Sequence, residues 1–189
     1  MASDDAALVR ASQRGDREAF GMLISRHAQS ILSLTTRMLG PTADAEDVAQ
    51  ETFVAAYKAL SAFKFDSKFS TWLYRIGVNK CTDSLRARHP QTVSLDAGSD
   101  ESSVAWEVAD EETPHSELEQ VELAGELDKG IRALPHVYRE SFVLRHVEGL
   151  GYDEMSAILG VHRDTLKMRV YKARTLLCQS LAHLDGAYR

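Results

Sequence analysis

The side chains with the clearest chemistry in this sequence are cations along one predicted helix near the carboxyl terminus. A short apolar-faced helix ends at Gly160, and a second helix follows a turn at Val161–His162. Leu166, Val170 and Leu177 recur at helical spacing and can pack inward. The cations left for solvent or phosphate are Arg163, Lys167, Arg169, Lys172 and Arg174. This pattern favours a DNA-binding helix-turn-helix over an ordinary solvated face.

A second group of candidates interleaves aromatic rings with cations. Phe69 and Trp72 suit core packing, whereas Phe63 and Phe65 are expected on an open loop and suit stacking on unpaired bases. Lysines nearby can follow the nucleic-acid backbone. The helix that follows carries Asn79, Asp83 and Arg86 on one side. An Asp83–Arg86 pair alone would be an ordinary surface ion pair, but Asn79 beside an aromatic loop can hydrogen-bond an extruded base.

A third group forms an acidic face on a predicted helix, with Val48 and Thr52 facing the core. Its members, including an aromatic ring expected to be exposed at its side, are Asp44, Asp47, Gln50, Glu51 and Phe53. The helix dipole accounts for acids in the first turn. Glu51 lies well past that turn, so a protein surface with basic residues is a candidate partner.

Helices must position all three groups, because no strand pattern is found. The breaks are Gly40-Pro41, His89-Pro90 and Leu134-Pro135. The sequence therefore predicts an all-α fold with two helical domains, residues 1–90 and 116–189, joined by a flexible acidic linker, residues 91–115. The predicted helices are Ala6 towards Gly15, Arg17–Leu39, Ala45–Leu60, Ser70 or Thr71 to Arg88, a segment from Ser116, and Tyr138–Glu148 before the helix-turn-helix.

The net charge of −6 is distributed unevenly along the chain. Residues 1–90 carry 12 Lys and Arg against 10 Asp and Glu, and residues 121–189 carry 10 against 9. Residues 91–120 carry nine acids and no Lys or Arg. The acidity is therefore confined to one segment, which lacks periodicity and has Trp106 as its one large apolar residue.

Composition argues against several other classes of protein. No apolar run is long enough to span a bilayer and no signal peptide is found, so we expect a cytoplasmic protein without membrane insertion. Cys81 and Cys178 lack metal-ligand spacing and are expected to be two reduced thiols. No metal set, cofactor motif or catalytic triad can be assembled, so an enzyme is not expected.

Together these motifs resemble bacterial RNA polymerase sigma factors of the extracytoplasmic-function (ECF) class, group IV of the sigma-70 family. The resemblance covers nearly the whole chain apart from the linker. The matching residues are 44–53, 69–76, Asn79 with Asp83 and Arg86, Leu134-Pro135, Tyr138-Arg139-Glu140 and 152–174. Several motifs in the family's order are more specific than a helix-turn-helix alone.

The resemblance implies that the acidic face of Asp44, Asp47, Gln50, Glu51 and Phe53 binds core RNA polymerase. It also implies a −10 promoter element recognised and melted by Phe63, Lys64, Phe65, Lys68, Trp72, Arg75, Asn79, Lys80, Asp83 and Arg86. Base edges or nearby phosphates of the −35 element would be contacted by Lys167, Met168, Tyr171 and Lys172. The remaining −35 residues, on the DNA backbone or in support, would be Arg145, Arg163, Thr165 and Arg169.

The family also implies an anti-sigma factor that occludes both domains, and a linker that threads through polymerase. Two positions depart from the family pattern, since Gly151 and His162 stand where relatives usually carry Ser. Gly151 is a tolerable N-cap that Glu154 can reach back to, whereas His162 is a poor cap. Met168, often a small residue in relatives, could contact a thymine methyl.

The alternative function is a stand-alone helix-turn-helix regulator that binds a palindrome as a dimer. That alternative leaves the acidic face and the aromatic loop unexplained. Gel filtration and a pull-down with core polymerase would separate the two.

Overall fold

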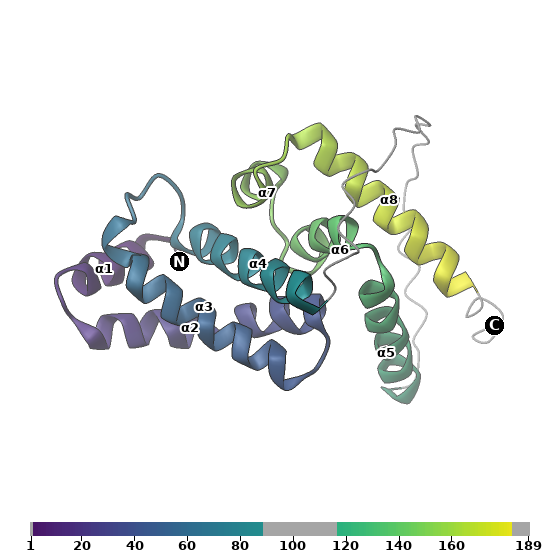
Figure 1. Ribbon diagram of the computed structural model, residues 1–189, viewed down its shortest axis with the longest axis horizontal. Coiled ribbons are helices and arrows are strands. Elements are labelled where there is room, and N and C mark those ends of the chain that lie inside the picture. The colour runs from purple at the N-terminus through teal and green to yellow at the C-terminus, as the bar shows by residue number, and fades with distance from the viewer. Residues whose placement is uncertain (1, 89–116, 183–189) are drawn as a thin grey trace.

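The computed structural model describes residues 2–88 and 117–182, with side chains for residues 5–88 and 124–182. Every regular element in these ranges is a helix, which confirms the predicted all-α class. The predicted linker, residues 91–115, and its Trp106 lie outside the described residues. Figure 1 shows a first helical body, residues 2–88, beside a second helical body, residues 117–182. None of the described helices has both the length and the apolar character that a membrane span requires.

The first body is built around one long helix. Its elements are α1 (Ala2–Gln13), α2 (Arg17–Leu39), α3 (Ala43–Ala59), the 3-10 turn η1 (Leu60–Ala62) and α4 (Phe69–Arg88). α2 begins after Asp16, whose carboxylate accepts a hydrogen bond from the Ala19 N–H at 3.0 Å. It ends at Gly40, whose φ of 95° favours glycine. The predicted helix Arg17–Leu39 is confirmed with both of its ends.

The core of the first body lies between α2, α3 and α4. Phe20, Leu23, Ile31 and Leu34 are buried on the face of α2 that their spacing predicts. Ala45, Val48 and Thr52 of α3 and Leu73 and Val78 of α4 are buried against them. Because α3 packs on both α2 and α4, its acids can lie only on the remaining face.

The second body has shorter helices. Its elements are α5 (Glu117–Ala133), α6 (His136–Phe142), the π-helical turn η2 (Val143–Val147), α7 (Tyr152–Leu159) and α8 (Arg163–Leu181). α6 and η2 together replace the single predicted helix Tyr138–Glu148, and α6 begins directly after the expected break at Pro135. The core brings η2, α7 and α8 together through Leu144, Met155, Ile158, Leu166 and Val170, all buried.

The two bodies are in direct contact. α7 packs on α4, while α5 and η2 pack on α2. Arg139 of α6 donates from Nη1 to the Met38 carbonyl in the last turn of α2 at 2.6 Å, and an ion pair joins Arg37 to Asp128 of α5. Figure 1 shows α4 and α7 facing each other across this contact.

Candidate nucleic-acid interface

The helix-turn-helix consists of α7, a three-residue turn and α8. The Gly151 N–H donates to Glu154 Oε2 at 3.1 Å, so Glu154 does reach back to the start of α7. Gly160 ends α7 with a φ of 67°, the left-handed conformation that favours glycine. At the start of α8, His162 Nδ1 accepts from the Asp164 N–H at 3.4 Å, a long bond that agrees with a weak cap.

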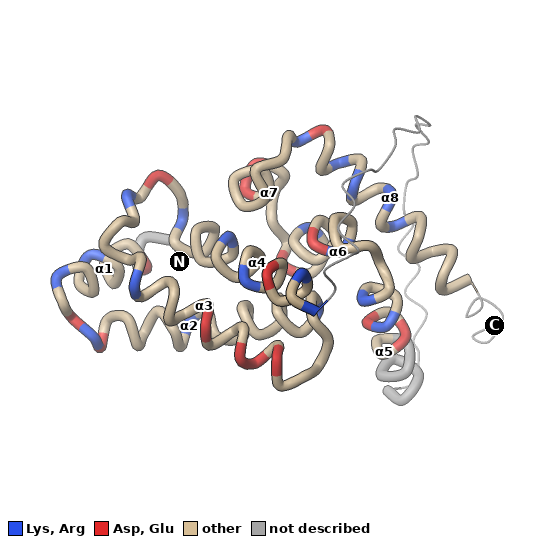
Figure 2. The backbone as a smooth tube through the Cα atoms, viewed as in Figure 1, with Lys and Arg blue, Asp and Glu red and all other residues tan. Residues whose placement is uncertain are grey.

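α8 divides into an apolar face and a polar one. Leu166, Val170 and Leu177 are buried, which confirms the predicted inward residues. The side chains on the opposite face are exposed, Met168 to 50% and Tyr171 to 37%, and Figure 2 shows Lys and Arg spaced along this helix. The predicted −35 residues on this exposed side of the body are Arg163, Thr165, Lys167, Met168, Tyr171 and Lys172.

Two cations of α8 are paired with acids at its amino-terminal end. Lys167 Nζ lies 3.0 Å from Asp164 Oδ1, and Arg163 Nη1 lies 3.0 Å from Asp153 Oδ1 of α7. The hydrogen bond from Lys167 lowers the pKa of Asp164. Since all four side chains are more than half exposed, such pairs contribute little to stability, and DNA phosphates can replace the acids as partners.

Two other predicted −35 residues lie beneath the exposed face. Arg145 donates to the Leu150 carbonyl at 2.9 Å, and its guanidinium lies 4.9 Å from the Tyr152 ring centroid. Arg169, with 20% of its side chain exposed, donates to Glu140 Oε1 at 3.3 Å. Both arginines therefore support the helix-turn-helix from within. Burial of Glu140 raises its pKa to about 7, while Arg169 acts against the shift.

In the first body, α4 carries the predicted base-binding stripe. Arg75, Asn79, Asp83 and Arg86 are all exposed, and their spacing places them on one side of the helix. Lys80 lies beside the stripe and donates to Glu51 Oε2 of α3 at 2.8 Å. The structure therefore brings these predicted −10 residues together.

The aromatic loop before α4 differs from the prediction. The expectation that Phe63 is exposed on an open loop is wrong, because Phe63 is only 6% exposed. Its ring centroid lies 5.0 Å from that of Phe65, 6.1 Å from that of Phe69 and 5.1 Å from that of Trp72, so the rings form a cluster. Phe65 is half-buried under the Arg10 guanidinium, which lies 4.8 Å from the ring centroid.

The exposed part of this loop is polar. Lys64 and Lys68 are exposed, and Lys68 Nζ donates to Glu154 Oε1 of α7 at 2.7 Å. Trp72 is half-buried beside them. The loop therefore offers cations and one partly exposed indole, with Phe63 as its internal support.

The predicted acidic face is present on α3. Asp44, Asp47, Gln50 and Glu51 are exposed, and Figure 2 shows acids gathered in the first part of α3. The expectation that Phe53 is exposed is wrong: it is 9% exposed, because α2 and α4 cover the sides of α3.

Apolar surface next to the acidic face comes from residues that the sequence reasoning missed. Val54 is 53% exposed and Tyr57 is 47% exposed. Helical spacing from Gln50 and Glu51 places Val54 on the same side. This spacing could have identified Val54 as part of the same surface from the sequence alone.

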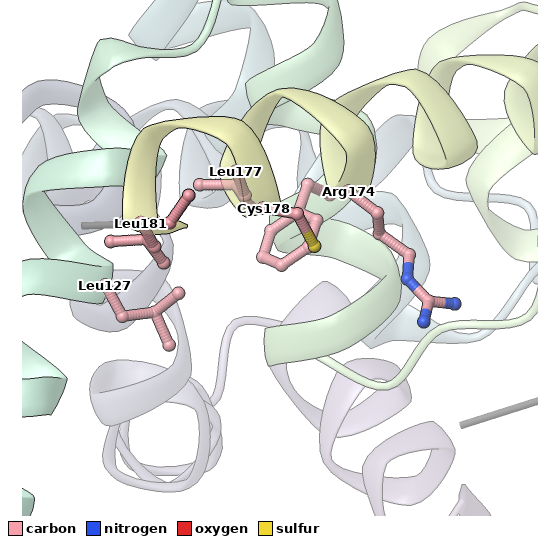
Figure 3. A pocket seen from close by; sticks show the side chains of 7 residues that line it. Leu127, Arg174, Leu177, Cys178 and Leu181 are labelled. Carbon is pink, nitrogen blue, oxygen red and sulfur yellow. The ribbon is translucent and has the colours of Figure 1, made fainter. Parts of the chain in front are cut away.

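The second body also carries an apolar groove of about 350 Å³. It is lined by Leu127, Phe142, Arg174, Leu177, Cys178, Leu181 and Ala182, as Figure 3 shows. Cys178 is exposed there, whereas Cys81 is buried in the first body, where burial raises its pKa to about 12. The two thiols are unpaired, as predicted. The described residues contain no group of three or more His, Cys, Asp or Glu that could hold a metal ion.

Comparison with known proteins identifies both bodies. Residues 23–90 match the family model for sigma-70 region 2, and residues 124–177 match the model for sigma-70 region 4. The chain is 36% identical over 173 residues to the ECF RNA polymerase sigma-E factor of Escherichia coli K12, with 90% of each chain covered.

Two solved structures are similar to the whole fold. CnrH in complex with the cytosolic domain of CnrY has a TM-score of 0.67 at 30% identity, covering 97% of this chain and 98% of the other. The sigma factor RpoE of Bartonella quintana, in complex with the anti-sigma factor NepR, has a TM-score of 0.64 at 24% identity, covering 86% and 96%. With two family models matched in order and a relative aligned nearly end to end, the chain belongs to the ECF family of RNA polymerase sigma factors.

Proposed function

We propose that this ECF sigma factor reads one promoter with two bodies, the −10 element with the first and the −35 element with the second. The proposed boundaries are residues 1–90 for the first domain, 91–115 for the linker and 116–189 for the second domain. The observation that carries the proposal is the exposed, cation-bearing face of α8 on a buried apolar stripe, in a chain that matches both sigma-70 regions.

For the −35 element, we assign base contacts to Lys167, Met168, Tyr171 and Lys172. Lys can donate to guanine, and an exposed Met can contact a thymine methyl. Arg163 and Thr165 are assigned to phosphate at the start of the helix. Arg145 and Arg169 act by holding α8 in place through Leu150 and Glu140, which agrees with their partly buried positions.

For the −10 element, we assign base capture to Asn79, supported by Arg75, Asp83 and Arg86 on the same side of α4. Lys64, Lys68 and Lys80 would follow the strand backbone, and the half-buried Trp72 and Phe65 would meet an unstacked base. Phe63 keeps the loop in shape from inside the ring cluster.

For core polymerase, we assign the exposed acids Asp44, Asp47 and Glu51 together with Gln50, and add the neighbouring Val54 and Tyr57. An acidic rim beside exposed apolar side chains fits a basic protein surface. Phe53 acts from below as packing. Polymerase contact with Glu51 would also free Lys80 for DNA.

We further propose that an anti-sigma factor holds this chain inactive and that it works in the cytoplasm, where polymerase is found. Support comes from the Bartonella quintana neighbour, whose structure is a complex with an anti-sigma factor. A role in stress response belongs to the same proposal. This chain would have no catalytic activity of its own.

Run-off transcription with purified core polymerase on a promoter library tests the proposal. We expect the wild-type chain to select promoters that core polymerase alone does not. Asn79→Ala should reduce open-complex formation about tenfold while duplex binding stays nearly constant, because capture of an unpaired base is needed only after melting. The control is Gln179→Ala, an exposed amide of α8 beyond the assigned residues. If Asn79→Ala reduces duplex binding and promoter melting equally, Asn79 does not capture an unpaired base.

A further inference from the structure

Three polar contacts join the region of α4 to the second body along nearly the whole helix. We call them the α4 seam. The pairs are Lys68 Nζ with Glu154 Oε1 (2.7 Å), the Tyr74 hydroxyl with Glu148 Oε2, and Thr82 Oγ1 with His136 Nε2 (3.2 Å). Residue numbers rise along one side of the seam as they fall along the other, so the two segments run antiparallel, with the helix packing concentrated between α4 and α7.

Glu148 lies at the middle of the seam, between two helices of the first body. Its Oε2 accepts a hydrogen bond from Tyr74 of α4, and Ser33 and Arg37 of α2 act to lower its pKa. Its other oxygen, Oε1, is buried without a hydrogen-bond partner in the described structure. Burial raises the pKa of this carboxyl. Because this buried carboxylate has so few hydrogen-bond donors, the contact between the two bodies should depend strongly on each donor.

A second anchor fixes the second body to the end of α2. Arg139 Nη1 donates to the Met38 carbonyl, and Nη2 donates to the carbonyls of Arg132 and Leu134. One side chain therefore holds backbone atoms from both bodies. The contact between the bodies is thus a specific polar fit rather than a loose apposition.

The closed arrangement cannot serve both promoter elements at once. α7 contacts both α4 and α8, and packed helices lie about 8–10 Å apart, so the two DNA-reading helices are separated by roughly 20 Å. Sites at −10 and −35 are about 25 base pairs apart, or roughly 85 Å at about 3.4 Å per base pair. In addition, Lys68, a proposed −10 contact, is already engaged by Glu154.

We propose that the free chain is self-inhibited: the second body acts as an internal competitor, closing on α4 through the seam, and must detach before the chain reads a promoter. The proposal rests on the proposed function for what it inhibits, but closure itself is a property of the free chain. Polymerase and promoter would select the open form, so their apparent affinities are lowered by the fraction of closed molecules.

The first test is small-angle X-ray scattering on the free, full-length chain and on Tyr74→Phe. In the closed chain, Tyr74→Phe removes the hydroxyl that donates to Glu148, whereas in the open chain the substitution leaves the free energy unchanged. The ratio of closed to open molecules should therefore fall about tenfold. The radius of gyration should rise in Tyr74→Phe. It should not rise in Tyr57→Phe, which loses an exposed hydroxyl outside the seam. If Tyr74→Phe has the helicity and the radius of gyration of the wild type, the α4 seam does not hold the two bodies together and the proposal is wrong.

The second test locks the seam in a Cys178→Ser background. Thr82→Cys and His136→Cys, neither assigned to a binding surface, are bridged by a short bismaleimide. Cys81 is buried and is expected to stay unmodified. The unbridged protein, which has lost one seam contact, should transcribe at least as well as wild type, and the bridged protein should lose at least about tenfold of its promoter-dependent transcription. Full transcription activity of the bridged variant would refute self-inhibition. Absence of promoter-dependent transcription with the wild-type chain would instead refute the proposed function.

Discussion

The two bodies present their proposed DNA contacts in opposite ways. In the second body, one face of α8 is buried in the core and the other carries the contacts, including the exposed Lys167 and Met168. In the first body, the contacts of the loop before α4 surround a packed aromatic cluster, and the cations Lys68 and Lys80 are paired with acids of α7 and α3. On α8, the residues proposed to bind DNA are therefore distinct from those that form the core. In the loop before α4, the two groups of residues are in contact with each other.

This difference has a consequence for mutational studies. A substitution on the exposed face of α8 should change DNA affinity and leave stability alone. A substitution of Phe63 inside the aromatic cluster should change stability first, and any loss of promoter melting would follow from it.

The largest expected effect is on Phe63. Phe63→Ala should lower the free energy of unfolding by about 3–5 kcal/mol, because it empties the centre of a buried ring cluster. Urea unfolding measures this. A loss under about 1 kcal/mol would place Phe63 on the surface, as its sequence context alone suggests, and would remove the contrast between the bodies.

A smaller effect is expected for Lys167 on α8. Lys167→Ala should weaken binding to the −35 element by about 1–3 kcal/mol, because a base contact is lost, while unfolding changes by less than about 0.5 kcal/mol. Binding is measured by polymerase-holoenzyme titration of promoter DNA. Lys129→Ala, an exposed cation of α5, is the matched control. Promoter selectivity equal to wild type would remove Lys167 from the interface.

The smallest effect concerns pH and His136. Burial lowers the pKa of His136 to about 4, with Arg139, Arg86 and Arg169 adding to the shift. Its imidazole is therefore neutral in the folded chain, whereas the unfolded chain binds a proton near pH 6.5. Stability should fall as the pH drops from about 6.5 towards 4, because the unfolded state binds more protons.

His136→Gln should remove about 1 kcal/mol of that acid-dependent loss, discounted because 30% of the His136 side chain is exposed. The neighbouring Glu140, whose pKa is raised from 4.5 to about 7, gives the opposite trend over an overlapping range, about pH 4.5 to 7, and is present in both proteins. Because Glu140 Oε2 lies 3.6 Å from His136 Nδ1, the difference between the two pH profiles reports His136 together with this contact. Parallel profiles from pH 7 to pH 4.5 would mean that His136 is not held neutral by burial.

Periodicity predicted the interior of α8 and both ends of α2, because each depends on local rules: one apolar face, an Asp cap and a terminal glycine. Phe53 and Phe63 were placed wrongly for the opposite reason. Each is covered by neighbouring helices or rings, and the sequence does not state which sides of α3 or of the loop are covered.

The contact between the two bodies could not be predicted from the sequence. Tyr74 meets Glu148 across 74 positions, and Arg139 meets Met38 across 101. No local signal in a single sequence links such residues. The sequence left two roles open for Arg145 and Arg169, DNA backbone contact or support, and their bonds to Leu150 and Glu140 are the reason that we propose support.

The proposed function requires that α4 and α8 read two ends of one promoter. Site-specific photocrosslinking tests it most directly: a photoreactive amino acid is introduced at position 79 in one sample and at position 168 in another, each in complex with core polymerase and the same promoter fragment. We predict crosslinks about 25 base pairs apart, position 79 to the unpaired −10 strand and position 168 to the −35 duplex. Crosslinks from position 168 to two symmetric half-sites about one helical turn apart, with none from position 79, would contradict the account and indicate a dimeric helix-turn-helix regulator.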